Sequence, residues 1–351
     1  QNTQSAPVQP DIKNPCHRVR FHENNRFLFR VYYYEKRISL ELFHALSDAY
    51  GAMVLLNTLT AQYLRLKEGA DIPPGFSVLN INEAATKTEL EDAFSRYANS
   101  KVKAKRSGDF VYHAVGERMP AHRMNIVTGY MPLDTLLEKA HEKKVTVTEL
   151  LAAVLMDVHY RKQLQEKRKQ KIVSVQIPVN LRKWFPSDTL RNFSLCYNVK
   201  LNPNLGEYSF DEILRHVSTY LRHVNNPKEL NSMMTTNMQL EKNPVMRVMP
   251  LFIKKAGIGM SFMLTGEKTI SALISNLGRI QLPPEMDSYV DRYILMTGPG
   301  KLNGARLAAV SYGNTFAVTF ANIYKENDLE RGFFTSLVKL GIPVKIESNR
   351  E

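Results

Sequence analysis

The hydrophobic and polar positions near the start of the chain predict a hairpin followed by a helix. Aromatic and β-branched residues fill the runs FLFRVYYY and ISLEL, and the charged residues Glu35 to Arg37 separate them. This pattern over Arg26–Leu42 is typical of two strands joined by a turn. From Ala52 to Leu66 apolar residues then recur at helical spacing, with Ser47 or Asp48 as the expected cap.

The rest of the chain mixes helices and strands. Thr146 and Glu149 form a predicted capping box before an apolar helix that continues to Val158. Strands are expected at 172–178, 193–201, 269–274 and 293–297, helices at 87–97, 209–223, 228–240, 245–256 and 328–340, and a hairpin at 305–324 that turns at Gly313-Asn314. Because strands and helices do not alternate strictly, we expect an α/β protein of two-layer sandwiches rather than a doubly wound or barrel fold.

A segment rich in charge and glycine divides these elements into two groups. Lys101 to His122 has few periodic apolar residues and is interpreted as a linker. We therefore expect an N-terminal half over residues 1–105, a crossover linker over 106–123 and a C-terminal half over 124–351.

Composition is that of an ordinary globular protein. The 351 residues are 44% hydrophobic and 23% charged, so the chain can bury a sizeable core in one or two domains. No apolar run reaches the length of a membrane span, and the polar start lacks a signal-peptide core. Two cysteines, Cys16 and Cys196, cannot form a disulfide framework, which fits a cytoplasmic location.

Net charge points to anionic partners without choosing among them. The chain carries 47 Lys and Arg against 34 Asp and Glu, a net charge of +13. Its densest basic stretches, Lys101–Arg106 and Arg161–Lys171, lack the interleaved aromatic residues of a single-strand binding platform. We interpret them as solvated charges of a linker and a helix end, and we expect no nucleic-acid partner.

Common catalytic motifs are absent. The sequence contains no GxGxxG after a strand, no GxxxxGK[ST], no GxSxG and no HExxH. The glycine-rich stretch Gly298–Gly304 is interpreted as a plain turn. The nine histidines are scattered, so no metal site is expected.

One segment, Phe43 to Gly51, can carry chemistry. If the second strand continues, His44 shares the apolar face of Ile38 to Leu42, and Asp48 follows four residues later. Two interpretations remain open: a buried, hydrogen-bonded histidine beside an N-cap, or a reactive pair. Ser47 lies too close in sequence to both for a serine-hydrolase relay.

The segment ISLELFHALSDAYG resembles the HxxxDG signature of the CoA-dependent acyltransferase superfamily. Its members include chloramphenicol acetyltransferase, plant BAHD acyltransferases, peptide-synthetase condensation domains and bacterial alcohol acetyltransferases, the branch that this chain resembles most. Two later segments agree in type and order: PVNLRKWFPSDTLRNF, which ends at Phe193, and SNLG at Ser275–Gly278. The chain differs from the family pattern at Phe43, where many relatives have a second histidine, and at Ala49, where they have glycine, while Gly51 follows two residues later.

The resemblance implies two chloramphenicol-acetyltransferase-like halves with an active-site channel at their interface. It also implies an N-terminal strand and helix before Gln1. His44 would be the general base, Ser275 and Asn276 candidate oxyanion or substrate contacts, and Asp48 with Arg182 a structural ion pair.

The resemblance implies acyl-CoA as donor, a small hydroxyl or amine acceptor, no further cofactor, and a monomer or weak oligomer. The expected activity is transfer of an acyl group, acetyl by preference, to an alcohol. A carrier-fed condensation-like enzyme and a non-catalytic binding member are the alternatives.

Overall fold

The computed structural model describes residues 3–12, 14–102, 104, 108–166, 169–254, 257, 266–300, 302 and 305–350. Four predicted segments lie partly outside these residues: the basic stretches 101–106 and 161–171, the turn 298–304 and the helix 245–256.

By its internal contacts the chain divides into two compact units. The first consists of Gln1–Ala93, Asn180–Ser194 and Arg279–Arg292, and the second of Phe94–Val179, Leu195–Gly278 and Tyr293–Glu351. The predicted halves were each continuous in sequence, whereas the first unit takes two segments from the later part of the chain.

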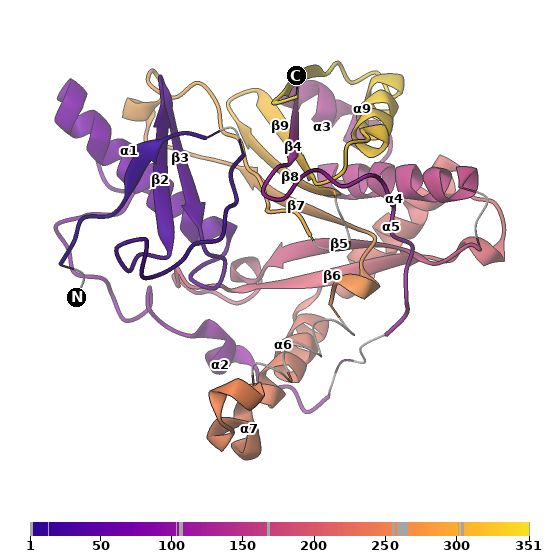
Figure 1. Cartoon of the computed structure of the whole chain (residues 1–351), viewed down its shortest axis with the longest axis horizontal. Helices are drawn as coiled ribbons and strands as arrows, with labels where there is room; N and C mark the ends of the chain where they lie inside the picture. The colour runs from indigo at the N-terminus through magenta and orange to yellow at the C-terminus, as the bar shows by residue number, and fades with distance from the viewer. Residues whose placement is uncertain are drawn as a thin grey trace. The chain divides into compact units, whose positions relative to one another are not determined.

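The first unit contains a three-stranded sheet and one long helix (Figure 1). Strand β1 (Val8–Pro10) runs parallel to β2 (Phe29–Tyr34), which pairs antiparallel with β3 (Arg37–Leu42). Helix α1 (Ala49–Glu68) packs against β3 and ends at Gly69, whose φ of +67° requires glycine or strain. The predicted hairpin and the helix after it are confirmed.

The predicted helix over 87–97 is wrong in its first half. Only α2 (Ala93–Tyr97) is helical, because the preceding carbonyls bind another segment. The Leu190 N–H donates to the Glu89 carbonyl (2.9 Å), and the Thr189 hydroxyl donates to the Glu91 carbonyl (2.7 Å). These tertiary hydrogen bonds replace the ones that a helix would make there.

The short helices η1 (Leu181–Lys183) and η4 (Pro284–Met286) complete the first unit.

The second unit is built on a mixed seven-stranded sheet. Its strands lie in the order β10 (Lys345–Ser348), β4 (Asn125–Pro132), β9 (Thr315–Asn322), β8 (Ala305–Tyr312), β7 (Ala272–Arg279), β5 (Val173–Asn180) and β6 (Ser194–Leu201). Strands β8 and β9 form the predicted hairpin, which turns at Gly313 with φ of +56°. Strands β5 and β7 pair in parallel, which requires the long connection between them.

Helices form the second layer of this unit (Figure 1). They are α3 (Leu133–Glu142), α4 (Val147–Gln165), α5 (Phe210–Val224) and α9 (Asp328–Lys339). The unit also contains α6 (Pro227–Lys242) and α7 (Pro244–Val248), which lie below the sheet in Figure 1, and the short η2 (Pro203–Leu205) and η3 (Glu267–Thr269). Helix α4 packs against α3, α5 and α9, and its side chains are buried on almost every side. Thr146 and Glu149 make the predicted capping box at its start, and Ser209 and Glu212 make another on α5.

The core between α9 and the sheet is aromatic. Phe320 on β9 contacts Phe333 and Phe334 of α9 edge to face, with ring centroids 5.2 and 5.7 Å apart. Gly129 on β4 makes room for this cluster, because a Cβ there would lie 2.3 Å from the Phe334 ring. The α/β fold class of layered sandwiches is confirmed.

Three later elements differ from the sequence prediction. The expected strand at 293–297 is irregular, and its aromatic residue Tyr293 packs edge to face on Tyr312 (5.4 Å) without joining a ladder. Strand β7 starts at Ala272 rather than residue 269, because η3 occupies the preceding residues. The helix expected at 245–256 is interrupted at Pro250. Helix α7 ends at Val248, and residues 251–254 are helical again. Within the described ranges, no helix combines the length and apolar character needed to cross a bilayer.

Candidate active site

His44 lies in a tight turn at the end of β3. The strand stops at Leu42, and the turn is closed by the Leu46 N–H, which donates to the Phe43 carbonyl (2.9 Å). The His44 side chain is exposed, and its ring has no hydrogen-bond partner among the residues that the structure describes. The expectation that His44 continues the inward face of the strand is therefore wrong, because the chain leaves the strand before reaching it.

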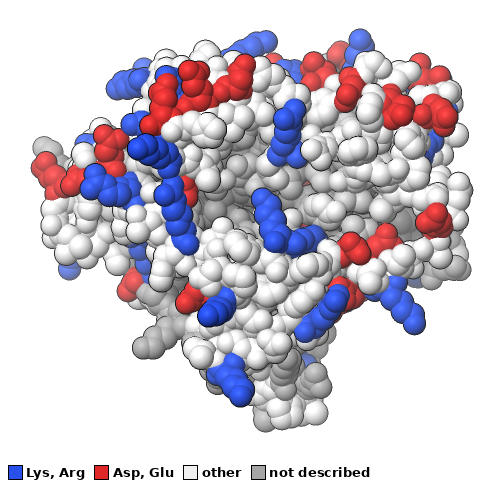
Figure 2. Space-filling view, turned by 180° about the vertical axis from the view of Figure 1, so that it is seen from behind, with Lys and Arg blue, Asp and Glu red and all other residues white. Residues whose placement is uncertain are grey.

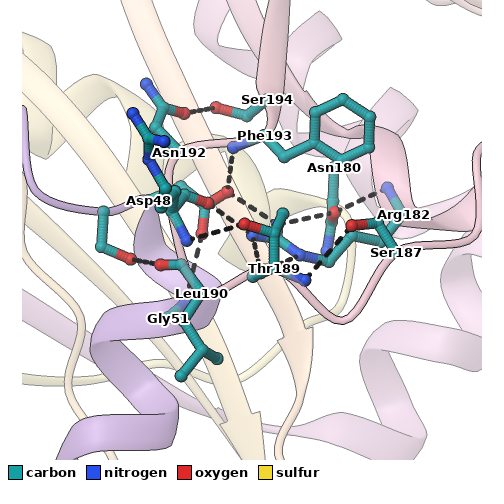
Figure 3. A network of polar contacts seen from close by, with 12 residues as sticks. Asp48, Gly51, Asn180, Arg182, Ser187, Thr189, Leu190, Asn192, Phe193 and Ser194 are labelled. Atoms are coloured by element: carbon teal, nitrogen blue, oxygen red, sulfur yellow. Dashed lines mark hydrogen bonds and ion pairs between the residues drawn. The ribbon is translucent and has the colours of Figure 1, made fainter. Parts of the chain in front are cut away.

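Asp48 fixes the far end of this turn. One carboxylate oxygen accepts a hydrogen bond from the Gly51 N–H (3.1 Å) and so caps α1. The other accepts from the Phe193 N–H (2.9 Å) and from Nη1 of Arg182 (2.7 Å), as Figure 3 shows. The side chains of this ion pair are only 7% and 8% exposed, so solvent screens their attraction weakly.

Every nitrogen of the Arg182 guanidinium donates a hydrogen bond. Nη1 donates also to the Asn180 side chain (3.2 Å), Nε and Nη2 donate to the Thr189 carbonyl (3.0 and 2.7 Å), and Nη2 donates to the Arg191 carbonyl (2.7 Å). The guanidinium also lies over the Tyr50 ring, 4.6 Å from its centroid. Such complete pairing is what a charged group needs when it is removed from water.

A second contact ties the turn to the same loop. The Ser47 hydroxyl donates to the Leu190 carbonyl, which lies next to Gly51 (Figure 3). A Cβ on Gly51 would lie 2.1 Å from the Ser47 hydroxyl and 2.4 Å from the Leu190 carbonyl, so only glycine fits. Ala49 is the first residue of α1 and needs no positive φ. In this chain the position that only glycine can fill is therefore Gly51. It lies two residues after the glycine of the HxxxDG signature.

The site thus joins residues distant in sequence within the first unit. The expected partners Asp48 and Arg182 are in contact, 134 residues apart. The sequence analysis included the loop after Arg182 in the family resemblance but did not predict that Thr189, Leu190 and Phe193 act through backbone groups. Backbone N–H and carbonyl groups are shared by nearly all residue types, so the sequence does not show which residues use them. Only Asn180, two residues before the arginine, could have been recognised as a supporting side chain.

Ser275 and Asn276 lie on β7, which belongs mainly to the second unit. The Asn276 amide donates to the Thr148 hydroxyl (3.0 Å), and its carbonyl oxygen accepts from the Gly278 N–H (3.0 Å). Ser275 is half-buried, and its side chain has no hydrogen-bond partner among the described residues. Asn276 therefore stabilises the strand end, where Gly278 takes a φ of +85°, and Ser275 is the less constrained donor of the two.

Neither thiol is an activated nucleophile. Desolvation of the sulfur raises the pKa of Cys196 to about 11, and desolvation together with the charge of Glu41 does the same for Cys16. Both cysteines are therefore thiols rather than thiolates near neutral pH. The described part of the chain also holds no cluster of His, Cys, Asp and Glu arranged to bind a metal ion.

Comparison with solved structures defines the fold, although no family model and no curated protein matches the sequence. F. sporotrichioides TRI101 complexed with Coenzyme A and T-2 gives a TM-score of 0.56 at 12% identity, over 88% of this chain and 66% of that one. Polyketide synthase associated protein 5 from Mycobacterium tuberculosis gives 0.54 at 13%, over 96% and 80%. The first condensation domain of the CDA synthetase gives 0.50 at 13%, over 86% and 63%.

These likenesses place the chain in one fold class. It has a mixed α/β fold similar to those of TRI101, the polyketide synthase associated protein and the condensation domain of the CDA synthetase. The chain spans about two thirds of the TRI101 and CDA synthetase chains and four fifths of the polyketide synthase associated protein. At 12–13% identity the shared fold leaves the reaction and its substrates to be argued from the site.

Proposed function

We propose that this protein is an acyltransferase that moves an acyl group, acetyl by preference, from acyl-CoA to an alcohol hydroxyl, with His44 as general base. One observation carries the proposal: an exposed histidine stands on a turn whose two ends are fixed, by β3 before it and by the buried Asp48–Arg182 pair after it. A base held on a fixed backbone loses little conformational freedom when it meets a substrate.

The proton transfers of the reaction need one base, which this turn offers. A neutral imidazole nitrogen takes the proton from the acceptor hydroxyl while the hydroxyl oxygen attacks the thioester carbonyl. The resulting tetrahedral intermediate collapses, the carbon–sulfur bond breaks, and the imidazolium returns the proton to the leaving CoA thiolate. The products are an ester and CoA, and no covalent enzyme intermediate forms.

The oxyanion of the intermediate requires a hydrogen-bond donor. We assign this role to the Ser275 hydroxyl, whose side chain has no other partner among the described residues. Asn276 would hold the strand end through its bonds to Thr148 and Gly278.

The buried ion pair has a structural role in this proposal. Both carboxylate oxygens of Asp48 accept hydrogen bonds, from Gly51, Phe193 and Arg182, and no hydrogen bond joins Asp48 to the His44 ring. The pair instead fixes the backbone that carries His44.

Charge supports a phosphate-bearing donor. The net charge of +13 favours approach of polyanions such as CoA at low ionic strength. Figure 2 shows Lys and Arg side chains spread over one face, while much of the Asp and Glu lies along its upper edge.

The test is acceptor-dependent release of CoA from acetyl-CoA, followed by mass spectrometry over a panel of alcohols and amines. His44→Ala should lower turnover by about 10² to 10⁴ without changing the melting temperature, because the side chain is exposed and makes no packing contact that the fold needs. His141→Ala, which removes another exposed histidine on α3, is the matched control and should keep full activity. Equal rates for wild type and His44→Ala would contradict the proposal.

A carrier-fed condensation-like reaction is the second candidate, because the condensation domain of the CDA synthetase shares the fold. In that case acyl groups presented on a carrier protein, but not acyl-CoA, would be consumed, still with loss in His44→Ala. A non-catalytic binding role, to which Phe43 and Ala49 point, predicts no turnover of either donor by folded wild type.

A further inference from the structure

Four large apolar side chains are exposed to solvent at the end of α7 and just after it. Val248, Leu251, Phe252 and Ile253 are 83%, 79%, 74% and 44% exposed, and we call these four residues the apolar tip. Single exposed apolar residues are common on protein surfaces, but four within six residues form a patch that indicates an interaction site.

The tip belongs to an arm of the second unit built on α6. Helix α6 contacts α7 and leads into it, and in Figure 1 both lie at the lower end of the view. The segment after α2 is fixed along α6 by hydrogen bonds from Ser100 N to Thr235 Oγ1 (3.0 Å), from Ala104 N to Thr236 Oγ1 (2.9 Å), and from Ser232 Oγ to the Val102 carbonyl (3.0 Å).

This fixed segment adds a cation and a further apolar side chain to the arm. Lys101 is exposed, and Val102 is 70% exposed. The chain from Asn243 to Lys254 also contains two basic residues, Arg247 and Lys254, and no acidic residue. The tip therefore lies in a stretch of chain, residues 243–254, whose charged residues are all basic.

We propose that the apolar tip docks the protein onto an anionic lipid surface. Segments that lie in a membrane interface join exposed Leu, Phe and Val to Lys and Arg, as this arm does. The apolar side chains would enter the boundary between head groups and acyl chains, while the cations meet lipid phosphates. This inference stands apart from the chemistry proposed at His44.

The first test is co-sedimentation of the full chain with vesicles of phosphatidylcholine alone and of phosphatidylcholine mixed with phosphatidylglycerol. Wild type should bind the anionic vesicles and be released by high salt. The double variant Leu251→Ser/Phe252→Ser should bind at least about tenfold more weakly, because two apolar side chains no longer leave water. Leu205→Ser, at an equally exposed leucine (78%) in η2, is the matched control and should bind as wild type.

The second test separates charge from apolar burial. Lys101→Glu should weaken binding to anionic vesicles by about fivefold or more, whereas Lys36→Glu, in the exposed β2–β3 turn, should not. No sedimentation of wild type, or equal binding by the double variant, overturns the proposal. Self-association that the double variant abolishes, without vesicle binding, overturns it in favour of contact between copies. Circular dichroism confirms that each variant is folded.

Discussion

At the scale of single residues, the fold of the first unit depends on the charge pair at its centre. Asp48→Asn keeps an acceptor for the cap of α1 but leaves the Arg182 guanidinium buried without its anion. Removing one partner of a buried pair costs about 3–5 kcal/mol of unfolding free energy. We expect chemical denaturation to show a loss of this size, together with lower activity as the His44 turn loosens.

The matched control is Asp211→Asn, which breaks an ion pair with Lys143 whose aspartate is 72% exposed. An exposed pair is worth about 0–1 kcal/mol, so this variant should unfold almost as wild type does. If Asp48→Asn and Asp211→Asn unfold at the same denaturant concentration, the structural role of Asp48 is wrong.

The sequence could indicate the charged side chains of this site but not its surroundings. Asp48 and Arg182 stand in recognisable motifs, whereas the Thr189 and Leu190 carbonyls that hold them could belong to any residue type. For His44 the sequence also predicted a wrong side-chain direction. Its parity with Leu40 and Leu42 holds only while the strand continues, and the turn at Phe43–Leu46 ends that register.

At the scale of elements, α4 contains a group that links stability to pH. His159 is buried, and its Nδ1 lies 2.8 Å from the Leu155 carbonyl. Burial lowers its pKa from 6.5 to about 4, with smaller contributions from the positive charges of Lys162 and His113. The unfolded chain therefore binds more protons between these two values, and folding stability must fall as the pH is lowered from about 6.5 to 4.

His159→Gln removes this titration while keeping an N–H donor. The variant should lose less unfolding free energy than wild type over that pH range, by about 3 kcal/mol at most. Denaturation curves at several pH values measure the slope, and His141→Gln, at an exposed histidine, should leave it unchanged. Parallel slopes for His159→Gln and wild type would show that His159 does not titrate as inferred.

Elements with complete local signals were predicted well. The capping box at Thr146 and the turn at Gly313 each combine a periodic pattern with a specific end signal, and the structure confirms both. Residues 87–92 and 293–297 had periodicity alone. Tertiary hydrogen bonds to Glu89 and Glu91, and ring packing by Tyr293, decided their structure instead.

At the scale of the whole molecule, the N-terminal segment alone cannot form the complete first unit. A fragment of residues 1–105 keeps Asp48 but lacks Arg182, the Leu190 carbonyl and the Phe193 N–H. We expect this fragment to lack cooperative unfolding and dispersed amide resonances. Adding a peptide of residues 180–194 should increase its order, and the same peptide with Arg182→Ala should not. A fragment that unfolds cooperatively by itself would contradict this dependence.

The interrupted first unit also affects how the protein folds during synthesis. Its sheet and α1 leave the ribosome early, but its last segment ends at Arg292, about 200 residues after Ala93. At roughly 5–20 residues per second, that interval lasts roughly 10–40 s. Asp48 stays uncompensated until Arg182 and Phe193 have been made, and the first unit stays incomplete until Arg292 has been made. The nascent protein is therefore exposed to aggregation during this interval, which gives molecular chaperones a defined period in which to act.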